Sequence, residues 1–276
     1  MKPLGPLDTT ELFVPLHDEL LILLRGLDPD DWERPTVAGR WRVRDVAAHL
    51  LDGDLRTLSM LRDGHRIEPA EPIGGYTDLV GFLNRLNAEW VEASRRLSPS
   101  VLAELLAVTG PEVAATFAAL PPDGASLLPV AWAGEEGAKN WMHVGREYTE
   151  RWHHQMQIRD AVGAPGLLQP RWLVPLLDLS VRALPAAYRS VGVAVGTTIV
   201  VEVEGGGAWS LVEQAGGWAI FGGAAATPDA VIRLDPETAW RSLYHALPPD
   251  VARSRARLTG PEALTAPFFE ARSVMV

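Results

Sequence analysis

The segment Glu150-Arg-Trp-His-His154 indicates a metal site on a long helix. Apolar periodicity predicts a long helix around it, from about Glu136 to Val162, so Glu150 and His154 lie one turn apart on one helix face. A carboxylate and an imidazole at this spacing, joined by an imidazole from another helix, can hold a divalent metal. Three protein ligands leave a coordination position open, which is typical of a catalytic metal.

The expected third ligand is His49, within the segment Trp41-Arg-Val-Arg-Asp-Val-Ala-Ala-His49. Asp45 precedes it by one helical turn and could orient its imidazole, as carboxylates do for metal-bound histidines. The same pair could equally be a hydrogen-bonded histidine facing a core. Glu150 and His154 could be a solvated helix pair worth roughly 0.3 kcal/mol. The residues alone leave both alternatives open.

A rival site lies on the same helix. His143, Glu147, Glu150 and His154 share one side of it, so His143 and Glu147 could hold a metal instead. His153 lies about 100° around the helix from His154. We expect His143 and His153 to be surface or supporting residues rather than ligands.

Composition excludes several classes of protein. The chain has 276 residues, is 47% hydrophobic and 22% charged, and carries a net charge of -10, which argues against a nucleic-acid partner. It contains no cysteine, which excludes disulfides, thiolate metal ligands and a cysteine nucleophile, so any thiol must come from outside. No signal-peptide pattern and no apolar run of membrane-spanning length is expected, which predicts a cytoplasmic protein without a membrane partner.

The first part of the chain has the periodicity of a four-helix bundle. The segment Ser98–Gly134 is expected to be an irregular connection, because Gly110-Pro111 is a turn signal. The predicted helices span Thr9–Leu27, Val43–Arg62, Thr77–Leu97 and Glu136–Val162.

After Gly163-Ala-Pro-Gly166 the pattern becomes mixed. A helix that Pro175 and Pro185 bend or end is expected over Arg171–Tyr188, and Asp235 is expected to cap a later helix. A closing helix is expected to start at Gly260. The predicted strands span Thr197–Val203, Trp209–Val212, Trp218–Phe221, Ala230–Leu234 and Arg257–Thr259. The fold class is therefore α+β, with a bundle over residues 1–165 and a small α+β domain over 166–276.

The motif around His49, together with Glu150-x-x-x-His154-x-x-Gln157-Ile, resembles the DinB superfamily of metal-binding four-helix bundles. Glu150 stands where many members have a histidine. This variant is similar to the mycothiol-dependent maleylpyruvate isomerase-like branch, which implies the ligand set His49, Glu150 and His154. Trp209-Ser-Leu-Val, Gly217-Trp218 and the segment Pro228–Trp240 resemble the sterol-carrier-like domain of that branch.

The resemblance implies a metal-dependent isomerase or S-transferase that acts on an electrophilic small molecule. Its cosubstrate would be a low-molecular-weight thiol, mycothiol in the named branch, and the divalent metal is expected to be zinc, with nickel left open. Arg233 and Arg241 are candidates for the arginine that contacts substrate, and a homodimer is left open. The alternatives are a non-catalytic module that binds a small molecule or lipid, and a metal-assisted hydrolase with Glu147 as general base.

Overall fold

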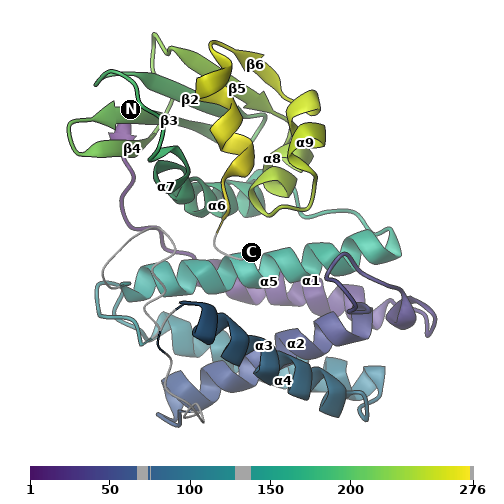
Figure 1. Cartoon of the computed structure of the whole chain (residues 1–276). Helices are drawn as coiled ribbons and strands as arrows, with labels where there is room; N and C mark the ends of the chain where they lie inside the picture. The colour runs from purple at the N-terminus through teal and green to yellow at the C-terminus, as the bar shows by residue number, and fades with distance from the viewer. Residues whose placement is uncertain (67–73, 75, 128–137, 274–276) are drawn as a thin grey trace. The chain divides into compact units, whose positions relative to one another are not determined.

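The computed structural model describes residues 1–66, 74, 76–127 and 138–273, and the chain divides into two compact units (Figure 1). The helical unit contains Thr10–Pro121 and Arg151–Gly166. The second unit contains Met1–Thr9, Pro122–Glu150 and Leu167–Val276. The division falls inside one continuous helix, which contributes residues to both units.

The helices expected in the first part of the chain are present, with shorter ends. The expected start at Glu136 lies outside the described residues. The elements are the 3-10 turn η1 (Thr10–Leu12), α1 (Phe13–Arg25), the 3-10 turn η2 (Asp31–Glu33), α2 (Val43–Thr57) with its π-helical extension η3 (Leu58–Arg62), α3 (Tyr76–Ser94), α4 (Pro99–Ala118) and α5 (Asn140–Val162).

The expectation of an irregular segment after Ser98 is wrong, because α4 runs through Gly110 and Pro111. The Ser98 hydroxyl accepts a hydrogen bond from the Val101 N–H and caps the helix. A Cβ at Gly110 would collide with the ring of His17 on α1. This glycine therefore serves close helix packing rather than a turn, and the helix tolerates the backbone hydrogen bond lost at Pro111.

Helix α4 also corrects the expectation that no apolar run is long enough to span a membrane. It reaches that length and composition. Four of its apolar side chains are at most 1% exposed and pack in the bundle, namely Leu102, Leu106, Val113 and Phe117, whereas Val101, Leu105 and Val108 on the other face are exposed. One buried face of this kind is typical of a helix that packs in the core of a folded domain.

One apolar core joins α1, α2, α4 and the last turns of α5. Trp32 of η2 closes it, and Ile158 of α5 is completely buried within it. The remaining buried members are Leu20, Leu21, Leu24, Val43, Val46, Ala47, Ala48, Leu50, Leu51, Leu102 and Leu106. This core fixes the faces that α2 and α5 present to each other.

The second unit is built on a mixed six-stranded sheet, in the order β1-β4-β3-β2-β5-β6. Strands β2 and β5 are parallel and the other pairs are antiparallel. The predicted strands are confirmed, and β3 and β4 pair as an antiparallel hairpin; β1, formed by Lys2 and Pro3, was not predicted. The strands are β1 (Lys2–Pro3), β2 (Thr198–Val203), β3 (Gly207–Gln214), β4 (Gly217–Gly222), β5 (Ala230–Leu234) and β6 (Arg257–Thr259).

The helix predicted over Arg171–Tyr188 is interrupted at Val181–Ala183 by the 3-10 turn η4. Pro175 lies inside α6 without ending it, whereas Pro185 lies in the first turn of α7. The prediction that Asp235 caps a helix is confirmed, since its carboxylate accepts from the Thr238 N–H at 2.9 Å. The helical elements are α6 (Pro170–Ser180), α7 (Leu184–Tyr188), α8 (Pro236–Leu243), the unpredicted α9 (Pro249–Arg255), α10 (Glu262–Thr265) and η5 (Ala266–Glu270).

Candidate metal centre

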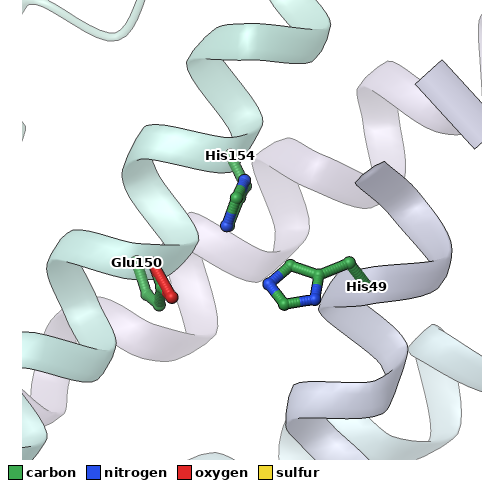
Figure 2. A group of neighbouring side chains, drawn as sticks. All are labelled: His49, Glu150 and His154. Carbon is green, nitrogen blue, oxygen red and sulfur yellow. The ribbon is translucent and has the colours of Figure 1, made fainter. Parts of the chain in front are cut away.

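Three side chains converge where α2 meets α5. His49 comes from α2, while Glu150 and His154 come from α5, and one potential ligand atom of each lies within 4.8 Å of the others. Figure 2 shows a ring nitrogen of each histidine and the carboxylate of Glu150 facing a common space. The two imidazole rings meet edge to face, with centroids 4.7 Å apart. Two imidazoles and one carboxylate are a suitable donor set for a borderline divalent metal such as zinc.

The continuity of α5 fixes two of these three positions. Glu150 and His154 both belong to α5. The helix runs unbroken from Asn140 to Val162, so the two side chains lie one turn apart on one face. His49 faces His154 within the helical unit. Among the described residues, no other set of three His, Asp or Glu side chains has this geometry.

His49 is held in a nearly closed environment and is 9% exposed. Burial lowers its pKa well below the usual value, and the nearby His154, Arg56 and Arg151 lower it further. Its imidazole is therefore neutral, the form that binds metal. Its Nδ1 atom has no hydrogen-bond partner among the described residues.

The expectation that Asp45 orients His49 is corrected by the structure. The Asp45 carboxylate, 2% exposed, accepts a hydrogen bond of 3.0 Å from the Arg42 N–H at the start of α2. Its other oxygen lies 3.6 Å from the guanidinium of Arg95. Asp45 thus caps the helix that carries His49, because an unsatisfied backbone N–H at a helix start favours a carboxylate there.

Gln157 orients His154. The Nδ1 atom of His154 lies 2.8 Å from Oε1 of Gln157, one turn further along α5. With the amide oxygen as acceptor, Nδ1 carries the proton and Nε2 keeps its lone pair for a metal. Nε2 of Gln157 in turn lies 3.4 Å from Nε2 of His153. Burial, and then the charge of His154, lower the pKa of His153 to about 3, so its ring is neutral and can accept this bond.

The rival residues are arranged differently. His143 is 4% exposed and His153 is 8% exposed, so neither is a surface residue. Nη2 of Arg146 lies 3.0 Å from Nδ1 of His143, and a guanidinium can only donate, so this nitrogen accepts. Burial lowers the pKa of His143. Glu147 lies 3.7 Å from Arg146, one turn before Glu150 on α5.

The candidate arginines are all engaged within the protein. Arg233 on β5 is exposed and pairs with Glu202 at 2.5 Å. Arg241 on α8 pairs with Glu237 at 2.8 Å and stacks on the ring of Trp240. The substrate contact expected for Arg233 and Arg241 stays a prediction.

Trp41 is a neighbour of the centre that sequence reasoning gave no role. Its ring centroid lies 4.9 Å from that of His49 and 6.4 Å from that of His154. The loop before α2 fixes it, since the Trp41 N–H donates to Ala38 and its carbonyl accepts from the Thr36 hydroxyl at 2.7 Å. Trp41 precedes α2, so helical periodicity could not place it.

The comparisons with known proteins identify the family of the chain. Residues 13–159, more than half of the chain, match the family model described as mycothiol maleylpyruvate isomerase N-terminal domain. The chain belongs to the mycothiol maleylpyruvate isomerase family. The predicted family is thereby confirmed. No curated protein matches the sequence.

Solved structures extend the likeness beyond the family domain. A crystal structure of a mutant of mycothiol-dependent maleylpyruvate isomerase aligns with a TM-score of 0.55 at 11% identity, over 94% of this chain and 96% of its own. A second structure of that isomerase aligns with a TM-score of 0.52 at 12% identity, over 88% and 91%. At these identities the likeness shows the fold, and it confirms the α+β class predicted for this member of the isomerase family.

Proposed function

We propose that this protein is a metal-dependent isomerase that uses a low-molecular-weight thiol as cosubstrate. Membership in the mycothiol maleylpyruvate isomerase family supports a thiol-dependent isomerase. The observation that carries the metal dependence is the convergence of His49, Glu150 and His154 inside the matched region. The ligand set and the choice of zinc are part of the proposal.

The nucleophile of the proposed reaction is the thiol of a separate small molecule, because the chain has no cysteine of its own. A bound divalent metal lowers the pKa of a thiol and so supplies a thiolate at neutral pH. The sulfur adds to one carbon of an activated cis double bond, and the π electrons move to the electron-withdrawing group. Rotation about the new single bond and departure of the thiolate then give the trans isomer. An S-transferase would share the first step but keep the carbon–sulfur bond.

The residues of the chain prepare this site in three ways. Burial keeps His49 neutral, and Gln157 holds His154 with Nε2 available. Trp41 lies against both imidazoles and limits access of water from its side. Glu150 supplies the negative charge that offsets part of the charge of a divalent ion.

The first test is metal content and activity measured side by side. Untagged wild-type protein should contain about one equivalent of a divalent metal, and His154→Ala should lose it while keeping its thermal unfolding transition. A cis-to-trans assay on maleylpyruvate should require both the metal and an added thiol such as mycothiol. Full thiol-dependent activity in metal-free protein would refute the metal role.

The same assay separates the alternatives. Hydrolysis would proceed without thiol, and Glu147→Gln would abolish it if this carboxylate were the general base. A binding module for a small molecule or lipid would show neither metal nor thiol dependence. The cytoplasmic location, the absence of nucleic-acid and membrane partners and the homodimer stay predictions.

A further inference from the structure

A buried ion pair joins the two helices that carry the proposed histidine ligands. Oδ1 of Asp54 on α2 accepts a hydrogen bond of 2.5 Å from Nη1 of Arg151 on α5. The Asp54 side chain is completely buried, and that of Arg151 is 13% exposed. Asp54 follows His49 along α2, and Arg151 precedes His154 along α5. Burial first, and then charges that include Arg151, lower the pKa of His49, so the pair lies close to the proposed centre.

Two further helices of the bundle contact this ion pair. The Thr109 hydroxyl on α4 donates to Oδ2 of Asp54 at 2.6 Å. The guanidinium carbon of Arg151 lies 5.9 Å from the centroid of the Phe13 ring on α1. The pair therefore has contacts on α1, α2, α4 and α5, the four helices that also share the apolar core.

The proposed ligand His154 lies between the ion pair and the apolar core. Along α5 the order is Arg151, His154 and Ile158, and Ile158 belongs to that core. Apolar contacts are not directional, and a core of suitable volume can form with small shifts of one helix along another. A carboxylate and a guanidinium must meet in one geometry, and buried polar groups can fix the register of packed helices. The ion pair can therefore set a position that the core alone leaves less defined.

Stability alone is a weak reason for burying this pair. Two buried charges lose their hydration, and apolar residues of similar volume are often at least as stabilising. The loss is larger here because Nε and Nη2 of Arg151 have no hydrogen-bond partner among the described residues. A second reason for the pair is therefore expected. A metal centre provides one, because its ligand distances must be correct to within about 0.2 Å.

We propose that Asp54 and Arg151 are positioning residues, whose ion pair fixes the register of α2 against α5 and so holds His49 and His154 where both can bind one metal ion. The proposal rests on the proposed function, since it needs a metal on both imidazoles. The two rings lie with centroids 4.7 Å apart. A helix displaced by one residue moves by about 1.5 Å, which is far more than a metal centre tolerates. The pair can thus act on the centre without touching the metal.

The experiment measures the cobalt(II) affinity and the absorption spectrum of the full chain, because the d–d absorption reports the coordination geometry. The double variant Asp54→Leu with Arg151→Leu removes both charges and should keep a thermal unfolding transition close to that of wild type. It should nevertheless bind cobalt(II) roughly tenfold more weakly, as loss of groups that orient metal ligands does, and with a changed d–d spectrum. Arg151→Lys keeps both charges and should retain more of the affinity than the double variant.

A matched control weakens an ion pair that joins α5 to α1 instead of α2. Nη2 of Arg159 on α5 lies 3.0 Å from Oε2 of Glu19 on α1. Glu19→Gln removes the charge of this partner and should leave the cobalt(II) affinity and the spectrum as in wild type. A loss of affinity equal to that of the double leucine variant would show that any loosening of the bundle has this effect, and would overturn the positioning role.

The positioning role would also be overturned by wild-type affinity and spectrum in the folded double leucine variant. If that variant fails to fold, Thr109→Val removes one donor to Asp54 and should weaken cobalt(II) binding in the same direction, and unchanged binding by Thr109→Val would then overturn the role. Failure of wild type to bind cobalt(II) would refute the proposed function itself, so the two failures are distinguishable.

Discussion

Gln157 accepts a hydrogen bond of 2.8 Å from Nδ1 of His154, one turn along α5. The amide therefore determines which nitrogen of the imidazole carries the proton and which is available to a metal. His153, buried and neutral, lies 3.4 Å from the other end of the same amide. The three side chains form one chain of contacts that ends at the proposed centre.

Gln157→Leu should reduce metal affinity by about 10- to 100-fold, because the imidazole loses the acceptor that fixes its tautomer. Competition with a chromophoric chelator measures this affinity directly. Gln157→Glu is the control, since its carboxylate still accepts from His154 and should retain most of the affinity. Equal affinities of wild type and Gln157→Leu would show that the amide does not orient the ligand.

Two glycine substitutions on helices of the same unit should act in opposite directions. Gly110→Ala places a methyl group against the ring of His17 and should destabilise the protein by about 1–2 kcal/mol through overpacking. Gly53→Ala meets no described atom within 4 Å and should stabilise it by up to about 1 kcal/mol. The melting temperatures of both variants and of wild type, measured by thermal unfolding, test these two expectations. A higher melting temperature for Gly110→Ala would contradict the close contact between α1 and α4.

Substituting only one partner of the buried ion pair between Asp54 and Arg151 should strongly lower the free energy of unfolding. Asp54 is fully buried, accepts from the Thr109 hydroxyl at 2.6 Å and pairs with Arg151 at 2.5 Å. Asp54→Asn leaves an uncompensated guanidinium and should cost roughly 3–5 kcal/mol in urea unfolding. The double variant Asp54→Leu with Arg151→Leu should recover much of this loss. A double variant less stable than Asp54→Asn would show that packing, rather than unpaired charge, sets the cost.

Asp235 should give the second unit a pH-dependent increment of stability. Burial raises its pKa, but hydrogen bonds from Thr238 and neighbouring backbone N–H groups outweigh burial and leave the pKa below its ordinary value of 3.8. The carboxylate therefore stabilises α8 above that value, and the increment is lost as pH falls through the lowered pKa. Asp235→Ala should cost about 1 kcal/mol near neutral pH. Its deficit should shrink in acid, and Asp235→Asn should retain most of the cap; a deficit independent of pH would argue against a charged cap.

The centre could be predicted from sequence to the extent that one helix determines it. The spacing of Glu150 and His154 fixes their relation within α5, because helical geometry is the same in any fold. Pairing them with His49 needed the family resemblance, since the approach of α2 to α5 depends on a core shared with α1 and α4. The role of Asp45 was mispredicted for the same reason. Its carboxylate could either orient His49 one turn later or cap the start of α2, and only the fold shows that it caps α2.

Helix α4 shows where local signals fail. Gly110 and Pro111 are both helix breakers by intrinsic propensity, and their succession is a sound turn signal in isolation. The ring of His17, 93 positions earlier in the chain, makes the glycine a requirement of packing. Strand β1 was missed for a related reason, because its two residues gain a partner only when β4 is in place.

The position of Trp41 gives the molecule an optical reporter. Its indole ring lies against both imidazoles of the centre, at 4.9 Å from His49 and 6.4 Å from His154. A paramagnetic ion such as cobalt(II) bound to these imidazoles would quench the fluorescence of this indole. The difference in emission between wild type and Trp41→Phe would therefore follow occupancy of the centre in real time, without a label and without turnover.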